Sequence, residues 1–360
     1  MRVLLCGGGT AGHVNPAIAI AETITKKDPT SKIAYVVTSN GIENDLVKFR
    51  KYKIEIQGFN KLFDLSNFKK LLKLKKAIKD SRAIINRFRP DVIIGTGGYA
   101  TFPVIYAGQK LGIKTVLHES NAIPGKAIKG LQKKADIMFI NFKDCEKYFK
   151  YKGNIIYSGN PVRAQFSHVE DEQESINYKE KYVILCYGGS LGAPKVNEIA
   201  VEIVENYIRN NLDVRFILST GKREYDKVID IMSKKRLNTL KNVEVYPYIY
   251  NMGRIMKVAD IVICRAGAMT ISELSACGKC SILIPSPNVA NNHQFENAKM
   301  LERKNATRVV VEKEKYLIVD TLRELLTRED LRNQIGFNIK KLHNSNSNEL
   351  IYNEIKKLLE

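Results

Sequence analysis

The chain contains no tryptophan, and only six of its 360 residues are cysteine. Cys6, Cys186 and Cys264 each stand inside an apolar run, where a buried free thiol is expected rather than a disulfide. Cys277 and Cys280 form a single C-x-x-C with no second pair at zinc-ribbon spacing. The cysteines therefore favour a reducing compartment, and they predict neither a disulfide framework nor a zinc or redox site.

Long hydrophobic runs are also missing. No apolar stretch reaches the roughly 20 residues that a membrane-spanning helix needs. The chain opens directly with a predicted strand at 2–6 and not with a charged and then apolar leader, so we expect no secretory signal. No D-x-D motif ends a strand and no cluster has metal-ligand spacing, so we expect no cofactor and no tightly bound metal. Any membrane contact should be peripheral.

Acidic residues are in deficit: 38 Asp and Glu face 58 Lys and Arg, a formal net charge of +20. Such an excess implies a polyanionic partner, which is nucleic acid, an anionic membrane surface or a phosphorylated substrate, unless the source organism is simply rich in lysine. The chain has no nucleic-acid recognition motif and no basic–aromatic interleaving over a sheet face, so we expect no nucleic-acid partner.

The most basic segment spans 61–89 and has a helical pattern. On a helical projection Leu71, Leu74, Ile78 and Ile85 form one stripe, which predicts a core-facing side. Two apolar residues fall instead on the basic side, a pattern that suits anionic lipid headgroups but is also compatible with a solvated, lysine-rich helix. The predicted membrane-docking residues are Phe68, Lys69, Leu72, Lys73, Lys76 and Lys79.

Short apolar runs alternate with helical segments along the chain, which predicts an α/β fold with parallel sheets. Two sets of strands with similar spacing indicate two Rossmann-like halves. We expect an N-terminal domain at 1–162, a second domain at 163–340, a linker region at 167–181 and a helical tail at 341–360 that packs back on the first domain. The predicted strands are 3–6, 33–37, 53–56, 92–95, 115–118, 137–140, 155–157, 182–187, 214–219, 243–246, 261–264, 281–284 and 308–311.

Four of these strands end in turns rich in glycine or other small residues, at 7–13, 95–99, 187–193 and 265–270. Glycine allows a close backbone approach to a ligand, and a helix that starts there directs its positive end at an anion. The spacing of Gly7, Gly9 and Gly12 fits G-x-G-x-x-G, but no acidic residue follows the second strand at 38–40 to hold a ribose. Dinucleotide binding is therefore disfavoured.

The turns form part of a longer series of motifs. These are GGGTAGHVNPAIAIA at 7–21, GTGGYATFP at 95–103, HESNAIPG at 118–125, GNPVR at 159–163, GGSLGA at 188–193, CRAGAMTISEL at 264–274 and NNHQFENA at 291–298. In this order they resemble the MurG family of UDP-N-acetylglucosamine:lipid I N-acetylglucosaminyltransferases. The departures are Ala11, Ser120 and the pair Asn292-His293. The resemblance implies a GT-B fold, with two Rossmann-like domains facing across a cleft.

By this resemblance, the second domain binds UDP. The main chain of Ile249 would bind uracil, and Glu273 would accept the ribose hydroxyls, although an acid early in a helix also complements the helix dipole. Gln294 would contact donor-sugar hydroxyls and Asn121 would meet the donor sugar from the first domain, with Thr10, Ala11 and Gly12 on the far wall. The groups expected around the diphosphate are Arg163, Ser190, Arg265, Ala268, Met269 and Thr270. Arg265 could instead be a surface cation at a strand end.

Inverting transfer requires a base that takes the proton from the acceptor hydroxyl. His13 follows the first glycine-rich turn and titrates near neutrality, although a histidine there can also cap or pack at the helix start. Glu119 is the competing candidate, and its neighbour His118 can serve as a strand-end hydrogen bonder.

The implied activity is transfer of N-acetylglucosamine from UDP-N-acetylglucosamine to the 4-hydroxyl of the MurNAc sugar in lipid I. The product would be lipid II for peptidoglycan synthesis, and hence for cell-wall biogenesis, cell shape and division. The implied partners are the UDP-sugar, the polyprenyl-linked acceptor and the cytoplasmic side of the cell membrane. The alternatives are a UDP-sugar-dependent diacylglycerol glycosyltransferase, a non-catalytic UDP-sugar sensor or membrane scaffold, and last a dehydrogenase.

Overall fold

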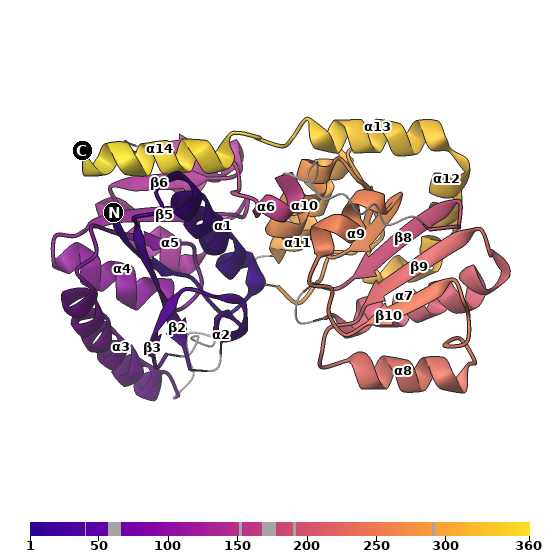
Figure 1. Ribbon diagram of the computed structural model, residues 1–360, viewed down its shortest axis with the longest axis horizontal. Coiled ribbons are helices and arrows are strands. Elements are labelled where there is room, and N and C mark those ends of the chain that lie inside the picture. Colours follow the sequence, from indigo (N-terminus) through magenta and orange to yellow (C-terminus); the bar gives the residue numbers. More distant parts are fainter. Residues whose placement is uncertain (40, 57–65, 151–152, 168–177, 190–191, 290–291) are drawn as a thin grey trace. The chain divides into compact units, whose positions relative to one another are not determined.

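The computed structural model describes residues 1–39, 41–56, 66–150, 153–167, 178–189, 192–289 and 292–360, with the backbone alone at 66–70 and 167. The chain divides into two compact units: unit 1 is Met1–Arg163 together with Asn344–Glu360, and unit 2 is Ala164–His343. Each unit has its own parallel sheet covered by helices (Figure 1). Most of the predicted linker region at 167–181 lies outside the described residues.

The sheet of unit 1 has the strand order β3-β2-β1-β4-β5-β6-β7, and every pairing is parallel. Its central strands are continuous apolar runs, because a parallel sheet is buried on both faces; Val3, Leu4 and Leu5 have no exposed surface. The strands are β1 (Arg2–Cys6), β2 (Lys32–Thr38), β3 (Arg50–Ile54), β4 (Val92–Gly95), β5 (Lys114–Glu119), β6 (Ile137–Ile140) and β7 (Ile155–Tyr157).

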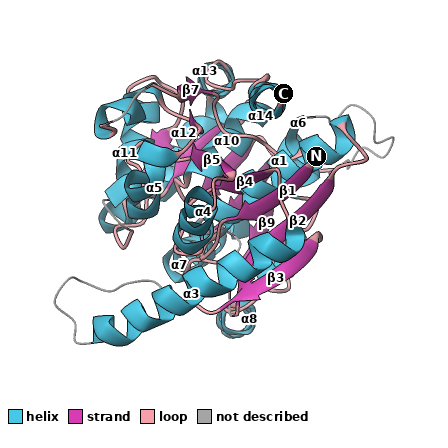
Figure 2. Ribbon diagram, turned by 90° about the vertical axis from the view of Figure 1, so that its left-hand side faces the viewer, coloured by secondary structure: helices cyan, strands magenta, loops and turns pink. Residues whose placement is uncertain are grey.

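Helices cover both faces of this sheet. One face packs against α1 (Ala11–Lys27) and the C-terminal helix α14 (Ser347–Leu359), and the other against α3 (Ser66–Phe88) and α4 (Thr101–Lys110). Figure 2 shows α3 along the outside of the unit, beside β3 and α4. The shorter helices are α2 (Glu43–Leu46), α5 (Lys126–Leu131), η1 (Gln132–Lys134) and η2 (Lys143–Tyr148).

The tail joins unit 1 through specific contacts. Ile351 and Ile355 are buried in the same apolar cluster as Ile24 of α1. The Asn348 side chain donates to the Val162 carbonyl at 2.9 Å and accepts from the Val162 amide at 3.0 Å. Arg163 was expected at the start of the second domain, but it is the last residue of the first part of unit 1. Residues 341–343 were expected in the tail, but they belong to unit 2.

Unit 2 repeats the plan with the order β10-β9-β8-β11-β12-β13, again with parallel pairings. Its strands are β8 (Tyr182–Tyr187), β9 (Val214–Ser219), β10 (Val243–Tyr246), β11 (Ile261–Cys264), β12 (Cys280–Leu283) and β13 (Arg308–Val309). Its helices are α6 (Ala164–Ser167), α7 (Pro194–Asn206), η3 (Ile208–Asn210), α8 (Tyr225–Lys234), α9 (Met252–Val258), α10 (Ala268–Cys277), α11 (His293–Glu302), η5 (Glu312–Leu317), α12 (Ile318–Thr327) and α13 (Glu329–Lys340).

The predicted α/β class with two Rossmann-like halves is confirmed, and Cys6, Cys186 and Cys264 are buried free thiols as expected. The third strand was placed wrongly at 53–56, since β3 begins at Arg50. β3 is the edge strand of the sheet, and an edge strand tolerates charged residues, so its first half lacks the apolar pattern of a buried strand. The last strand is shorter than the predicted 308–311. Among the described residues, no helix combines the length and apolarity that crossing a membrane requires.

Candidate functional site

The first glycine-rich turn of unit 1 links β1 to α1 and packs tightly on the turn that follows β4. Gly9 has a φ of +89°, which favours glycine. The Gly8 amide donates to the Gly97 carbonyl at 3.3 Å, and a Cβ on Gly98 would lie 2.0 Å from the Gly8 carbonyl oxygen. Thr10 is the N-cap residue of α1, and Ala11 and Gly12 are the first residues of the helix. Two glycine-rich turns of the same unit thus interlock at the carboxyl end of the sheet.

His13 lies half-buried in the first turn of α1, next to this junction. Its Nδ1 is 3.2 Å from Thr10 Oγ1, and its backbone carbonyl accepts a hydrogen bond of 2.6 Å from Thr96 Oγ1. A Cβ on Gly97 would come within 2.6 Å of His13 Cδ2. The imidazole therefore packs on a glycine and is held at a defined position at the helix start.

Glu119, the other predicted base, is buried at the end of β5. Its Oε1 accepts from both the amide and the side chain of Asn121, at 2.9 and 3.0 Å, and its Oε2 accepts from the Gly125 amide at 2.8 Å. Burial raises the pKa of Glu119, while these hydrogen bonds and Lys129 oppose the rise. Both oxygens thus hold the turn at 121–125, and Glu119 also fixes the side chain of Asn121.

His118 lies beside it with no exposed surface. Its Nε2 is 3.3 Å from the Gly159 carbonyl oxygen and its Nδ1 is 3.4 Å from Ser120 Oγ. Burial lowers the pKa of His118 to about 4. His118 is therefore a neutral imidazole at neutral pH that joins two strand ends.

One residue of this region was missed from the sequence. Glu43 is completely buried and reaches back to β2 and to the first glycine-rich turn, where its Oε2 accepts from the Gly9 amide at 3.4 Å. No acid stands at 38–40 directly after the second strand, but Glu43, the first residue of the short helix α2, reaches back to this position. The sequence does not reveal this contact, because Glu43 stands several residues beyond the strand and only the folded turn places its carboxyl at the strand end.

In unit 2, α10 begins at the carboxyl end of β11. Gly267 is its N-cap in an extended conformation, and Ala268, Met269 and Thr270 form the first turn. Glu273 follows one turn later and is only 7% exposed. The positive end of the helix dipole and a carboxyl therefore lie close together at the end of the sheet, a combination that suits a phosphate and a neighbouring diol.

Arg265 also lies at this strand end, but a later segment fixes its guanidinium. Its Nη1 is 2.7 Å from Glu312 Oε1 and donates to the Ile284 carbonyl at 3.1 Å. The Arg265 side chain is 11% exposed and that of Glu312 19%, so this ion pair is largely shielded from water. Glu312 was not identified from the sequence, since nothing in its local pattern links it to Arg265.

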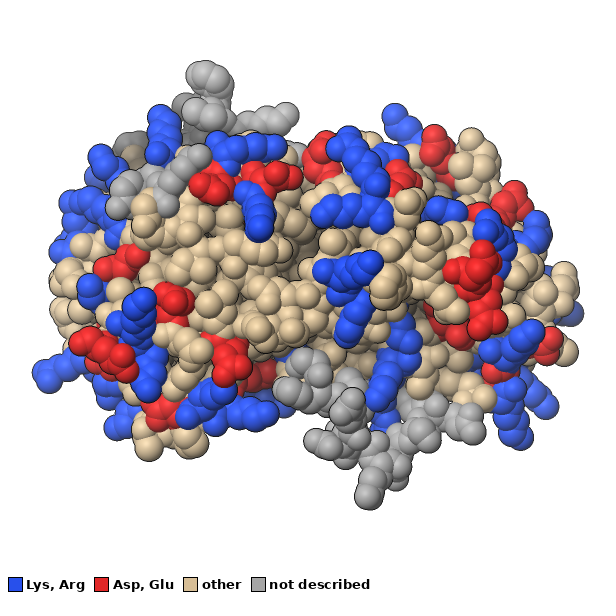
Figure 3. Space-filling view, turned by 90° about the horizontal axis from the view of Figure 1, so that it is seen from above, with Lys and Arg blue, Asp and Glu red and all other residues tan. Residues whose placement is uncertain are grey.

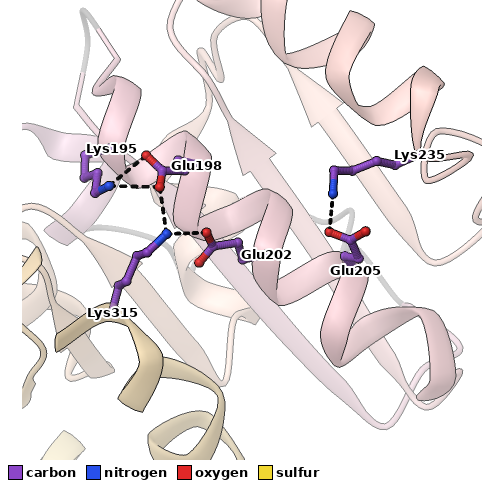
Figure 4. A network of polar contacts seen from close by, with 6 residues as sticks. All are labelled: Lys195, Glu198, Glu202, Glu205, Lys235 and Lys315. Atoms are coloured by element: carbon purple, nitrogen blue, oxygen red, sulfur yellow. Dashed lines mark hydrogen bonds and ion pairs between the residues drawn. The ribbon is translucent and has the colours of Figure 1, made fainter. Parts of the chain in front are cut away.

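Glu312 opens η5, and η5 is tied to α7 by a network of ion pairs (Figure 4). Lys315 Nζ lies 2.7 Å from Glu198 Oε1 and also contacts Glu202, while Lys195 lies 2.8 Å from Glu198 Oε2. Because α7 starts directly after the third glycine-rich turn, the network links the segment that positions Arg265 to that turn.

The third glycine-rich turn is also constrained. Gly192 has a φ of +78°, and a Cβ there would lie 2.1 Å from the Thr220 carbonyl oxygen. The buried side chain of Asn197 donates to the same carbonyl at 3.0 Å. The predicted residue Ser190 lies outside the described residues.

The remaining predicted donor contacts lie at the start of α11, after β10 and at the end of unit 1. Gln294 stands in the first turn of α11, and its Oε1 accepts from the Ser286 amide at 2.9 Å. Ile249 is buried just after β10, between two tyrosines whose rings meet edge to face at 4.8 Å. Arg163 is half-buried at the end of unit 1. Gln294 thus braces a loop in addition to any contact with a sugar.

The predicted membrane-docking helix is partly described. Leu72 is 53% exposed, and Lys73, Lys76 and Lys79 are exposed on α3, while the side chains of Phe68 and Lys69 lie outside the described residues. The predicted core stripe was wrong at one position: Leu71 is 45% exposed, whereas Ala77 and Ile84 further along α3 are buried. On the molecular face in Figure 3, Lys and Arg are dispersed among Asp and Glu.

Two family models match the chain. The glycosyltransferase family 28 N-terminal domain matches residues 3–140, and the glycosyltransferase family 28 C-terminal domain matches residues 183–349. The first match ends within unit 1, and most of the second lies in unit 2.

Curated relatives match over the full length. A protein of Acetivibrio thermocellus named UDP-N-acetylglucosamine–N-acetylmuramyl-(pentapeptide) pyrophosphoryl-undecaprenol N-acetylglucosamine transferase is 36% identical, over 100% of this chain and 98% of its own length. A protein of the same name from Alkaliphilus metalliredigens is 40% identical over 89% of this chain and 88% of its own length.

Solved structures share the fold. Acinetobacter baumannii MurG matches with a TM-score of 0.73 at 23% identity, over 99% of both chains. The UDP-GlcNAc 2-epimerase of Neisseria meningitidis, bound to UDP-GlcNAc, matches with a TM-score of 0.69 at 15% identity, over 99% of this chain and 100% of the epimerase. At these identities the likeness shows the fold alone, and that fold is GT-B.

Proposed function

This chain belongs to the family of UDP-N-acetylglucosamine–N-acetylmuramyl-(pentapeptide) pyrophosphoryl-undecaprenol N-acetylglucosamine transferases, within glycosyltransferase family 28, and on that ground we propose its reaction. It transfers N-acetylglucosamine from UDP-N-acetylglucosamine to the 4-hydroxyl of MurNAc in lipid I, which gives lipid II for peptidoglycan synthesis. The observation that carries this proposal is the match to relatives of that name over the full length of both chains.

In the proposed reaction the acceptor oxygen attacks C1 of the donor sugar. The bond from C1 to the UDP oxygen breaks, UDP leaves with the bonding electrons, and the hydroxyl proton passes to a base on the protein. Because the attack displaces UDP from the opposite side, the configuration at C1 inverts. Charge grows on the departing diphosphate, so groups that stabilise it there accelerate the step.

Most of the donor-binding groups in this proposal belong to unit 2. The start of α10 at Ala268, Met269 and Thr270 binds the diphosphate, and Glu273 accepts the ribose hydroxyls. Arg265, held by Glu312, adds a fixed cation at the same strand end. The other donor contacts proposed are Thr10, Ala11, Gly12, Asn121, Arg163, Ser190, Ile249 and Gln294.

We assign the base to His13. Glu119 uses both of its oxygens to hold the turn at 121–125, and His118 is buried with both ring nitrogens near hydrogen-bonding partners. His13 is half-buried in the first turn of α1, next to the first glycine-rich turn, and an imidazole is the side chain that most often serves as a general base.

We further propose that the protein acts as a peripheral protein on the cytoplasmic side of the cell membrane, docked through α3. Leu71 and Leu72 are exposed beside lysines of the same helix, and apolar residues in a basic setting bind anionic lipid surfaces. An acceptor with a polyprenyl tail requires such an approach. Unit 1 thus carries both the proposed docking helix and the proposed base.

The deciding experiment uses purified protein with radiolabelled UDP-N-acetylglucosamine and either lipid I or diacylglycerol. We expect label in the lipid I fraction, in a product that co-migrates with lipid II. Label that enters only diacylglycerol would show the alternative activity, and no label in either lipid would point to a non-catalytic role.

A further inference from the structure

We propose that Glu43 is a positioning residue for the acceptor side of the reaction, because it fixes the glycine-rich turn from which His13 follows. The structural part of this inference concerns the turn alone. Its kinetic part rests on the proposed function.

The carboxyl of Glu43 makes three hydrogen bonds to neutral donors. Its Oε1 accepts from the Thr38 amide at 3.0 Å and from Thr38 Oγ1 at 2.7 Å, and its Oε2 accepts from the Gly9 amide at 3.4 Å. Glu43 has no exposed surface. Burial of a carboxyl is costly unless donors satisfy it, so the side chain is bound to these two segments. It therefore joins the end of β2 to the turn after β1.

Close packing surrounds the same carboxyl. A Cβ on Gly8 would lie 2.9 Å from Glu43 Oε1, and a Cβ on Gly41 would lie 2.0 Å from it. On its other side Gly98 packs against the Gly8 carbonyl group, since a Cβ on Gly98 would lie 2.0 Å from the Gly8 carbonyl oxygen, and the Gly8 amide donates to the Gly97 carbonyl. The peptide between Gly8 and Gly9 is thus clamped between Glu43 and the turn that follows β4.

The clamp is directly connected to His13. Gly9 leads into Thr10, whose Oγ1 lies 3.2 Å from His13 Nδ1. Thr96, which precedes Gly97, holds the His13 carbonyl. A shift of the Gly9 peptide would therefore move Thr10 relative to the imidazole, while Thr96 continued to hold the backbone of His13.

Two nearly isosteric variants separate this role from a general contribution to stability. In Glu43→Gln the amide oxygen can still accept from Thr38, but the amide nitrogen then faces the Gly9 N–H, so two donors meet and the contact to the turn is lost. Thr38→Val removes one donor to the same carboxyl and leaves the contact to Gly9 in place. Both variants remove one hydrogen bond to the buried carboxyl, and only the first one releases the turn.

The test combines two measurements on the full-length protein. Amide hydrogen exchange at 9–13 should be about tenfold faster in Glu43→Gln than in the wild type, and within twofold of the wild type in Thr38→Val. For Glu43→Gln, kcat/KM for lipid I should fall about tenfold with a UDP dissociation constant within twofold of the wild type, because UDP binds mainly to unit 2. For Thr38→Val, kcat/KM should stay within twofold.

Equal exchange at 9–13 in the two variants would overturn the structural part of the inference. Faster exchange in Glu43→Gln with unchanged turnover of lipid I would overturn the kinetic part. A wild-type protein that transfers nothing to lipid I would instead refute the proposed function, and the exchange comparison would still decide whether Glu43 clamps the turn.

Discussion

Glu312 Oε1 lies 2.7 Å from Arg265 Nη1, so the arginine at the end of β11 is positioned by the first residue of η5. The same nitrogen donates to the Ile284 carbonyl. A flexible guanidinium becomes useful for stabilising a leaving diphosphate only when it is held in one place, because otherwise the reaction must bear the cost of ordering it.

Replacement of Glu312 by Gln should lower kcat three- to tenfold with a smaller effect on UDP affinity. The substitution keeps one acceptor oxygen but removes its charge. A hydrogen bond to a charged group contributes about 1.5 kcal/mol, and loss of part of this contribution corresponds to a decrease in rate of up to about tenfold. Steady-state kinetics and UDP calorimetry measure the two effects. Lys315→Met is the matched control: it breaks exposed ion pairs on the same segment and should leave kcat within about twofold. Equal losses of kcat in both variants would mean that the charge of Glu312 is not what makes Arg265 effective.

His13→Ala should lower kcat by about 10² to 10⁴, the usual contribution of a general base, with UDP affinity retained. The comparison is Glu119→Gln, which disturbs the turn at 121–125 but leaves His13 in place. A pH–rate profile measures both variants, and the limb that reports deprotonation of the base should vanish only in His13→Ala. A full loss of that limb in Glu119→Gln would move the base to Glu119.

His118 makes the stability of unit 1 depend on pH. Its pKa is lowered from 6.5 to about 4 by burial, so the unfolded chain binds a proton more readily than the folded one. The stabilising contribution is complete above pH 6.5 and is lost as the pH falls to 4, and it corresponds to about 3 kcal/mol. Glu119 acts in the opposite direction, since its raised pKa removes stability as the pH rises above 4.5.

His118→Gln should therefore flatten the loss of stability between pH 6.5 and 4. Urea unfolding at several pH values, followed by a probe in unit 1, gives the slope for the wild type and the variant. The slope left in the variant then reports the other shifted carboxyls of unit 1, with Glu119 opposed by Glu55. Identical slopes in the two proteins would mean that His118 does not control this transition.

The buried parts of the fold were predictable from the sequence, whereas exposed edges were not. Strands such as β4 and β11 are continuous apolar runs, and a parallel sheet buried on both faces requires that pattern. β3 was misplaced because it is an edge strand with Arg50, Lys51 and Lys53 on it. Leu71 was misassigned to the core because a helical stripe predicts a face but not how far along the helix the contact extends.

The turns of the candidate site were predictable, because a local motif carries their geometry. The glycine-rich turns were found because positive φ and close approach demand glycine at fixed spacing. Glu43 and Glu312 were missed because each acts on a distant segment through a tertiary contact that no local pattern records. The bonds of Glu119 to the turn at 121–125 are local, but the sequence alone could not show that both oxygens point inward.

Membrane docking predicts a difference between two exposed leucines. Leu72→Glu should weaken binding to anionic phospholipid vesicles about tenfold, because it replaces an apolar contact by a charge that the lipid surface repels. Leu212→Glu is the matched control, since Leu212 is 74% exposed and lies in unit 2; its binding should stay within twofold. Vesicle co-sedimentation measures both. If the two variants bind equally well, α3 is not the docking surface.

The junction between the glycine-rich turns of unit 1 can be tested with two glycines of similar conformation. Gly98 has a φ of +79° and Gly112 a φ of +73°, so alanine at either position carries the left-handed strain of about 1–2 kcal/mol. At Gly112 nothing lies within 4 Å of the added Cβ, whereas at Gly98 it meets the Gly8 carbonyl oxygen at 2.0 Å. Backbone cannot move aside as a flexible side chain can, so Gly98→Ala should cost at least about 2 kcal/mol more in urea unfolding. It should also lower transfer to lipid I, because the displaced Gly8 carries Gly9 and the start of α1 with it. Equal costs in the two variants would mean that the turns separate without penalty and that this junction does not position His13.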